Sequence, residues 1–154
     1  MFQAFLIKYG EIGVKGKNRY VFENALVDRM KEVLAETDGT FHIIREQGRI
    51  YVEAEGSFDY DETIEALKRV FGIVGICPVV LTEDHGFEAL SETVLDYMQK
   101  MYGDKTMTFK VMTRRVNKRF PMESMEVNAE LGGRILDQFP NMKVDVHHPD
   151  VILH

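Results

Sequence analysis

Hydrophobic and polar positions in the first half of the chain alternate or recur in ways that predict strands and helices. Residues 2–9 carry apolar side chains on both faces, which favours a central, covered strand. Apolar positions then recur at helical spacing as far as Ala35, and Asn18 is a suitable N-cap for that helix. Residues 40–45 and 49–54 alternate on either side of a short polar turn and predict a hairpin.

A second helix and a fourth strand follow the hairpin. Asp59 is a suitable N-cap for this helix, whose buried stripe is expected to contain Ile64, Leu67 and Phe71. Residues 73–81 have the composition of a strand, and Pro78 within them indicates an edge strand or a bulge. The resulting order, β-α-β-β-α-β, is that of the ferredoxin-like unit.

The second half of the chain predicts further helices. One is expected over residues 87–101, with Asp84 as its cap, and another over residues 123–139. The later helix contains Gly132 and Gly133, each of which would cost about 1 kcal/mol relative to alanine in an exposed helix. Close packing of this helix against a sheet is the expected reason for them.

Three strands are expected around these helices. Residues 107–114 alternate and predict a half-buried strand whose polar face carries Lys110 and Arg114. Residues 143–146 and 151–154 predict two more strands. The chain stops inside the last apolar run, which favours an excised fragment or an incomplete domain.

Composition narrows the class of protein. The chain has 154 residues, 45% of them apolar, and a net charge of −6, which describes a globular protein rather than a general DNA binder. No apolar run approaches ~18 residues, and the N-terminus opens with a strand pattern rather than a signal peptide, so a cytoplasmic protein is expected. The single cysteine, Cys77, excludes a disulfide framework and is expected to be a buried structural thiol.

The strongest chemical signal is a run of six cations within residues 105–119, with no acid between Asp104 and Glu123. A strand that leads into such a loop suits a polyanion such as a nucleic-acid backbone. A solvated basic loop is the alternative, and for an isolated charge run the two are about equally expected. Phe120 could stack on an exposed base, although a hydrophobic anchor for the loop is the more common role.

A second basic loop follows the first strand. Residues 10–19 contain three glycines and three cations, so their backbone can approach a phosphate closely. The pattern is neither a Walker A loop nor a Rossmann fingerprint, and ATP or NAD binding does not follow from it. By contrast, residues 53–65 carry six acids and no cation, which predicts a solvated side that faces away from RNA.

Two stretches resemble a known family. Residues 6–19, Leu-Ile-Lys-Tyr-Gly-Glu-Ile-Gly-Val-Lys-Gly-Lys-Asn-Arg, resemble the opening of the tRNA 4-thiouridine synthetase family, which is also linked to thiamine biosynthesis. Residues 109–121, together with Leu131-Gly132-x-x-Ile135 and His148-Pro149-Asp150, resemble its THUMP domain. The resemblance implies an α+β chain, an α/β sandwich, with a ferredoxin-like domain over residues 1–75. A THUMP domain that lacks its last strands would follow over residues 76–154.

In that family the two domains together bind tRNA. A PP-loop domain that follows them uses ATP and Mg to activate a uridine, and a cysteine desulfurase donates the sulfur. This chain lacks the PP-loop signature Ser-Gly-Gly-x-Asp-Ser and any candidate for the sulfur-carrying cysteine. The resemblance therefore implies substrate recognition for an ATP-dependent tRNA sulfurtransferase, with no catalytic residue, cofactor or metal in this chain. A homodimer is also expected.

The residues implied in RNA binding are cations of the two loops and one strand residue: Lys15, Lys17, Arg19, Lys110, Arg114, Arg115, Lys118 and Arg119. They are expected to contact phosphate and 2′-hydroxyl groups and to read RNA shape more than sequence. One alternative is a THUMP-bearing module of another RNA modifier, such as a methyltransferase or a pseudouridine synthase. Another is a ferredoxin-like domain that binds a protein and no RNA.

Overall fold

The computed structural model describes residues 2–10, 17–46 and 48–154, and the chain forms two compact units, Met1–Thr82 and Glu83–His154. Each unit has its own sheet and its own hydrophobic core. Within the described ranges, none of the helices has the length and apolarity needed to cross a membrane.

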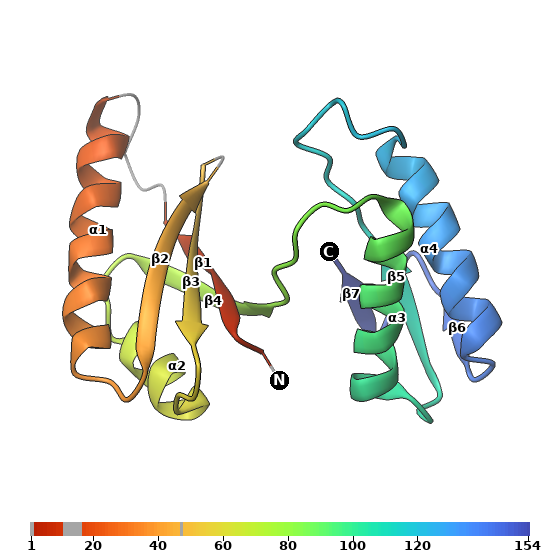
Figure 1. The fold of residues 1–154 in the computed structure, drawn as a ribbon, viewed down its shortest axis with the longest axis horizontal. Coiled ribbons are helices and arrows are strands. Elements are labelled where there is room, and N and C mark those ends of the chain that lie inside the picture. Colours follow the sequence, from red (N-terminus) through yellow and green to blue (C-terminus); the bar gives the residue numbers. More distant parts are fainter. Residues whose placement is uncertain (1, 11–16, 47) are drawn as a thin grey trace. The chain divides into compact units, whose positions relative to one another are not determined.

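The first unit is a four-stranded antiparallel sheet with two helices (Figure 1). Its elements follow the predicted order: β1 (Ala4–Tyr9), α1 (Lys17–Ala35), β2 (Thr40–Glu46), β3 (Arg49–Glu55), α2 (Tyr60–Lys68) and β4 (Ile73–Val79). The strand order β2-β3-β1-β4 places β1 inside the sheet and β4 at an edge, as the sequence predicts. This arrangement is the ferredoxin-like unit.

The core of the first unit lies between the sheet and its two helices. Phe5 of β1, Met30 of α1 and Leu67 of α2 are all 0% exposed and belong to one cluster, so both helices cover the same face. β4 pairs with β1 along its length and belongs to this unit. A boundary after residue 75 would cut β4, whereas the first unit extends to Thr82.

Two expectations for the first unit are wrong. Asn18 lies inside α1 rather than at its N-cap. Phe71 is not part of a buried stripe, because α2 ends at Lys68 and the Phe71 side chain is 94% exposed. Asp59 is confirmed as the N-cap of α2, where its Oδ1 accepts a hydrogen bond of 2.9 Å from the N–H of Glu62.

The second unit is a three-stranded parallel sheet with two helices. Its elements are α3 (Phe87–Tyr102), β5 (Met107–Val111), α4 (Ser124–Gln138), β6 (Met142–Val144) and β7 (Val151–Leu153). The order β6-β5-β7 places β5 in the centre, and α4 is the crossover that parallel pairing of β5 with β6 requires. Met98 of α3, Phe109 of β5 and Ile135 of α4 are 0% exposed and form the centre of its core.

Two expectations for the second unit are also wrong. The N-cap of α3 is Gly86, with a φ of 90°, while Asp84 accepts the N–H of Gly86 at 3.0 Å through its Oδ1. Gly132 and Gly133 do not serve close packing, because a Cβ at either position would meet no described atom within 4 Å outside its own stretch of α4 backbone. The packing of α4 on the sheet therefore depends on larger side chains such as Ile135.

Arg134 joins the two helices of the second unit through several contacts. Arg134 of α4 donates two hydrogen bonds of 2.7 Å to the carboxylate of Glu88 in α3 and one of 3.1 Å to the hydroxyl of Ser91. Its guanidinium also lies 4.8 Å from the centre of the Phe87 ring. The hydrogen bond from Arg134 is the main reason why the pKa of Glu88 is lowered. These contacts hold the first turn of α3 against α4.

Replacing Phe5 with alanine is expected to lower the free energy of unfolding of the first unit by about 3–5 kcal/mol, because a fully buried ring would leave a cavity. Phe71→Ala is the matched control, and the same truncation at an exposed position should change that free energy by less than about 0.5 kcal/mol. Urea unfolding followed by circular dichroism measures both variants. Equal losses would contradict the assigned core.

Candidate nucleic-acid interface

Residues 112–123, which join β5 to α4, form a loop that we name the basic loop (Figure 1). The N–H of Met112 donates to the carbonyl of Leu153 at 2.8 Å, so the chain stays bonded to β7 for one residue beyond β5. The N–H of Thr113 donates to Oδ1 of Asn128 in α4 at 2.9 Å. The beginning of the basic loop is therefore fixed both to the sheet and to the helix that follows.

Arg115 closes the basic loop from the inside. Its Nη1 donates to the carbonyl of Phe120 at 3.1 Å and to that of Met122 at 3.2 Å. Asn117 forms a tight turn between them: its carbonyl accepts the N–H of Phe120 at 3.2 Å, and its Oδ1 accepts the N–H of Arg119 at 3.0 Å. All of these acceptors are uncharged oxygens, so they hold the loop without neutralising its positive charge.

Three cations of the basic loop are exposed: Arg114, Lys118 and Arg119. In the part of the chain that the structure describes, none of the three has an ion-pair partner, and no acid occurs between Asp104 and Glu123. Unpaired cations on a closed loop can each neutralise a phosphate and release its counterion. The basic loop therefore has the charge and the geometry of a nucleic-acid contact.

Two other predicted residues of this unit are less available to a ligand than those cations. Lys110 does not share a strand face with Arg114, because β5 ends at Val111. Its Nζ instead donates to the carbonyl of Val146 at 3.4 Å. Phe120 is half-buried, so only part of its ring is available to a base.

The loop after β1 is described only in part. Lys15 lies outside the described residues, and Lys17 begins α1 with its side chain outside them. Arg19 donates from Nε to Oε1 of Glu23 at 3.0 Å and from Nη2 to the hydroxyl of Tyr9 at 3.4 Å. The hydroxyl of Tyr9 donates to the same Oε1 at 2.5 Å. The charge of Arg19 is therefore partly neutralised by a carboxylate.

A second cation joins Glu23, and the sequence alone does not reveal it. Arg45 of β2 lies 3.5 Å from Oε2 of Glu23, and it donates to Oδ1 of Asn24 at 2.7 Å. Its guanidinium also lies 5.9 Å from the centre of the Tyr20 ring. Arg45 and Asn24 are 21 residues apart and belong to different elements, so no local pattern indicates that they meet.

The shared carboxylate shifts two pKa values in opposite directions. The hydrogen bond from Tyr9 lowers the pKa of Glu23 below its usual 4.5, and Arg19 and Arg45 add to this effect. Burial, followed by the hydrogen bond to Glu23, raises the pKa of Tyr9 above its usual 10.0. Because the folded state depresses the pKa of Glu23, its contribution to stability is fully present above pH 4.5. That contribution is lost as the pH falls through the lower folded value.

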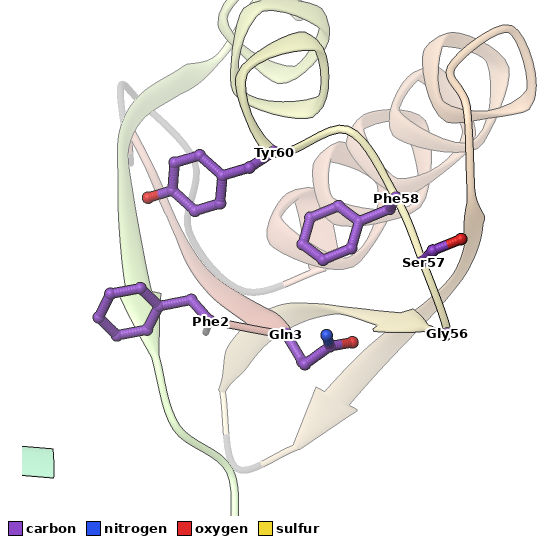
Figure 2. Close-up of a pocket in the computed structure, with 6 residues that line it drawn as sticks. All are labelled: Phe2, Gln3, Gly56, Ser57, Phe58 and Tyr60. Atoms are coloured by element: carbon purple, nitrogen blue, oxygen red, sulfur yellow. The ribbon is translucent and has the colours of Figure 1, made fainter. Parts of the chain in front are cut away.

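A shallow hollow near the N-terminal end of β1 is not part of the candidate interface. It has a volume of about 310 Å³, and its lining is shown in Figure 2: Phe2, Gln3, Gly56, Ser57, Phe58 and Tyr60. Asp59, Asp61 and Glu62, which adjoin this lining in the sequence, are exposed. Their negative charge disfavours a phosphate group there.

The other residues considered for metal binding or thiol chemistry are Cys77 and the histidines of the turn before β7. The described residues hold no group of three His, Cys, Asp or Glu side chains that could bind a metal ion. The expectation that Cys77 is buried is wrong, because it lies half-buried in the edge strand β4. In the turn before β7, Oδ1 of Asp145 accepts the N–H groups of His147 and His148 at 3.0 Å each, which lowers the pKa of Asp145.

Comparison with known proteins identifies both units. The family model of the ThiI ferredoxin-like domain matches residues 4–77, and that of the THUMP domain matches residues 85–154. The chain is 61% identical to a probable tRNA sulfurtransferase of Lachnospira eligens, over 99% of this chain and 39% of that protein. It is 53% identical to a probable tRNA sulfurtransferase of Agathobacter rectalis, over 100% of this chain and 39% of that protein. The chain thus spans about two-fifths of the length of these relatives.

Two solved structures share the fold over nearly the whole chain. A crystal structure of a 4-thiouridine synthetase–RNA complex with bound ATP matches with a TM-score of 0.79 and 31% identity, over 99% of this chain and 37% of that one. The crystal structure of PH1313 from Pyrococcus horikoshii matches with a TM-score of 0.76 and 32% identity, over 98% of this chain and 51% of that one.

Replacing Glu23 with glutamine is expected to lower the pKa of Tyr9. The variant loses the negative charge that disfavours the tyrosinate, and it leaves Arg19 and Arg45 free to favour it. Alkaline titration followed by NMR of the tyrosine rings measures the change. Tyr97, whose pKa is raised to about 12 mainly by burial, serves as the internal reference. An unchanged Tyr9 would contradict the coupling.

Replacing Arg115 with alanine is expected to open the basic loop, because the carbonyls of Phe120 and Met122 lose their donor. Each hydrogen bond from a charged group contributes about 1.5–3 kcal/mol, so the amide protons of residues 112–123 should exchange faster. Arg114→Ala is the matched control, since it removes the same charge from an exposed side chain. Equal exchange in the two variants would mean that Arg115 does not close the loop.

Proposed function

The chain belongs to the ThiI family, with a ferredoxin-like domain and a THUMP domain, and on this premise we propose that it binds tRNA. It would be the substrate-binding region of a tRNA sulfurtransferase, the activity for which its relatives are named. The RNA bound to the similar 4-thiouridine synthetase supports this choice of ligand. The observation that carries the proposal is the set of exposed cations, Arg114, Lys118 and Arg119, on a loop that is closed without carboxylates.

These cations are suited to the RNA backbone rather than to base edges. The major groove of an RNA helix is too narrow for side chains, so proteins read its shape through phosphates and 2′-hydroxyl groups. Arg114 and Arg119 can each offer a fork of N–H donors to a phosphate, and Lys118 offers a point charge. Lys110 and Arg115 are weaker candidates for direct contact, because both already donate to carbonyls within the protein.

The first unit would add contacts from the loop after β1. Lys15 and Lys17 remain part of the proposal on the strength of the sequence alone. Arg19 is a less favourable contact, because a phosphate would have to compete with Glu23 for its guanidinium. Its better supported role is to hold the start of α1 against the end of β1 through Tyr9.

The chemical reaction would lie outside this chain. A PP-loop domain of the parent enzyme would use ATP and Mg to activate the uridine, and a cysteine desulfurase would supply the sulfur. The proposal also includes a cytoplasmic location and a homodimer. Light scattering that gives a monomer mass across a concentration series would contradict the dimer.

The alternative functions have less support. Another RNA-modifying enzyme with a THUMP domain is disfavoured by the match of residues 4–77 to the ThiI ferredoxin-like domain. A ferredoxin-like domain that binds only a protein does not account for the THUMP unit that carries the basic loop, and it would have no RNA affinity at physiological salt.

Arg114→Ala is expected to weaken binding to unmodified tRNA and to lower its salt dependence, because an exposed cation is lost. Each phosphate contact removed should reduce the slope of log K against log salt concentration by about 0.7 to 0.9. A salt titration measures both quantities for the wild type and the variant, with a DNA duplex of equal charge as a second ligand.

Lys100→Ala is the matched control for this titration. Lys100 is exposed, pairs with Asp96 at 2.9 Å and lies in the last turn of α3. This helix precedes β5 in the chain, whereas the basic loop follows β5. Its removal should leave the affinity and the slope unchanged. Equal affinity of the wild type for tRNA and for the DNA duplex would mean that the basic loop is a general cation patch. No binding to tRNA at low salt would refute the proposed function.

A further inference from the structure

Phe71 is a large apolar side chain that the fold leaves in solvent. It lies in the turn between α2 and β4, and its exposed fraction of 94% is the highest of the exposed large hydrophobic residues that the structure describes. Val74, three residues further along, is also largely exposed, at 70%. Burial of a phenylalanine side chain is favourable, and this position does not obtain that stabilisation in the free chain. So exposed an aromatic ring is available to a ligand.

The residue before Phe71 is fixed in the core. Val70 is 2% exposed, its N–H donates to the carbonyl of Leu67 at 3.1 Å, and its carbonyl accepts the N–H of Ile73 at 3.3 Å. The turn is therefore tied both to α2 and to the start of β4. Phe71 cannot exchange places with Val70 without breaking these bonds.

The residue after Phe71 is fixed as well. Gly72 has a φ of 101°, and a Cβ at this position would lie 3.2 Å from the ring of Phe22. Its carbonyl accepts the N–H of Gly10 at 3.0 Å, which joins the turn to the end of β1. Because both neighbours are held inward, the backbone presents the Phe71 ring to solvent in a defined place.

The chain segments on either side of Phe71, and the strand β1 that pairs with β4, carry more cations than acids. Residues 2–10 and 66–82 contain three cations and no acid: Lys8, Lys68 and Arg69. Lys68 forms a salt bridge of 3.2 Å with Glu65. Arg69 is exposed and has no ion-pair partner among the residues that the structure describes. An exposed ring that follows Arg69 by two residues in the chain, next to a strand pair that carries Lys8, matches the chemistry of a nucleic acid, in which flat bases alternate with phosphates.

We propose that Phe71 is a stacking platform for an unpaired base of the bound RNA, with Arg69 and Lys8 contacting the adjoining phosphates. The proposal rests on the proposed function and adds a second contact, in the ferredoxin-like domain, to that of the basic loop. Stacking on an aromatic ring accepts any base, so this contact contributes affinity without reading sequence. Because the backbone of the turn is already fixed, binding of the base has to order only the side chain of Phe71 and not the loop that carries it.

The first test compares the affinity of the wild type, Phe71→Ala and Phe71→Leu for unmodified tRNA over a range of salt concentrations. Loss of one stacked base should weaken binding by about 5- to 100-fold. The salt slope should stay that of the wild type, because no charge is removed. Phe71→Leu keeps an apolar side chain but no ring, so it should bind as weakly as Phe71→Ala. A blunt RNA duplex, which offers no unpaired base, should bind all three proteins equally.

The second test uses fluorescence. The chain contains no tryptophan, so Phe71→Trp introduces a single tryptophan at the proposed site, which can be excited selectively over the six tyrosines. Its emission should be quenched when tRNA binds. Tyr60→Trp is the matched control: Tyr60 is 37% exposed, lies at the start of α2 and adjoins Asp59 and Asp61, where no RNA is expected. Its emission should stay unchanged.

Each contrary outcome has a distinct meaning. Equal tRNA affinity of Phe71→Ala and the wild type would overturn the stacking platform and leave the proposed function in place. A wild type that does not bind tRNA would overturn both. If Phe71→Leu binds tRNA like the wild type, an apolar side chain is sufficient, no base is stacked on a ring, and the proposal fails. If the emission of Phe71→Trp depends on protein concentration without RNA, Phe71 contacts a second copy of the chain, and the proposal also fails.

Discussion

The basic loop depends on the hydrogen bonds between the Arg115 guanidinium and the carbonyls of Phe120 and Met122. A carboxylate in the place of these carbonyls would hold the same guanidinium more strongly, but it would cancel one unit of charge at the surface that displays Arg114 and Arg119. Carbonyl oxygens satisfy the donors and leave the net charge intact. In a chain whose net charge is −6, a local positive field requires this kind of support, because any nearby acid would remove it.

Two arginines of the first unit, Arg19 and Arg45, are used in the opposite way. Glu23 holds Arg19 and Arg45 together with the hydroxyl of Tyr9, and it thereby joins the end of β1, the first turns of α1 and the strand β2. This cluster contributes to the position of α1 and adds little free charge to the surface. Cations that look alike in the sequence therefore fall into two groups, those that hold the backbone in place and those that remain available to a ligand.

The order of elements could be predicted because it depends on the spacing of apolar residues, which is local information. The inner position of β1, the edge strand β4 and the N-cap Asp59 all follow from local sequence features. Phe71 could not be predicted in the same way. Helical spacing assigns it to the buried face of α2, but the helix ends at Lys68 and Val70 takes the place in the core. The turn after the helix is held by a hydrogen bond from Gly10, and Phe22 leaves little room for a Cβ at Gly72. Both residues lie about 50–60 residues earlier in the chain, so no local pattern reveals them.

The sequence also could not predict which charged side chains of the basic loop face inward. Nothing in the run from Arg114 to Arg119 distinguishes the residue that faces inward from those that face outward, because the difference arises when the loop closes on its own carbonyls. That distinction matters for binding at physiological salt. Phosphate contacts weaken steeply as salt rises, whereas stacking on an aromatic ring involves no counterions. A chain with few free cations and a net negative charge therefore gains most from a fixed, exposed ring such as Phe71, because its contribution persists when the ionic contacts are screened.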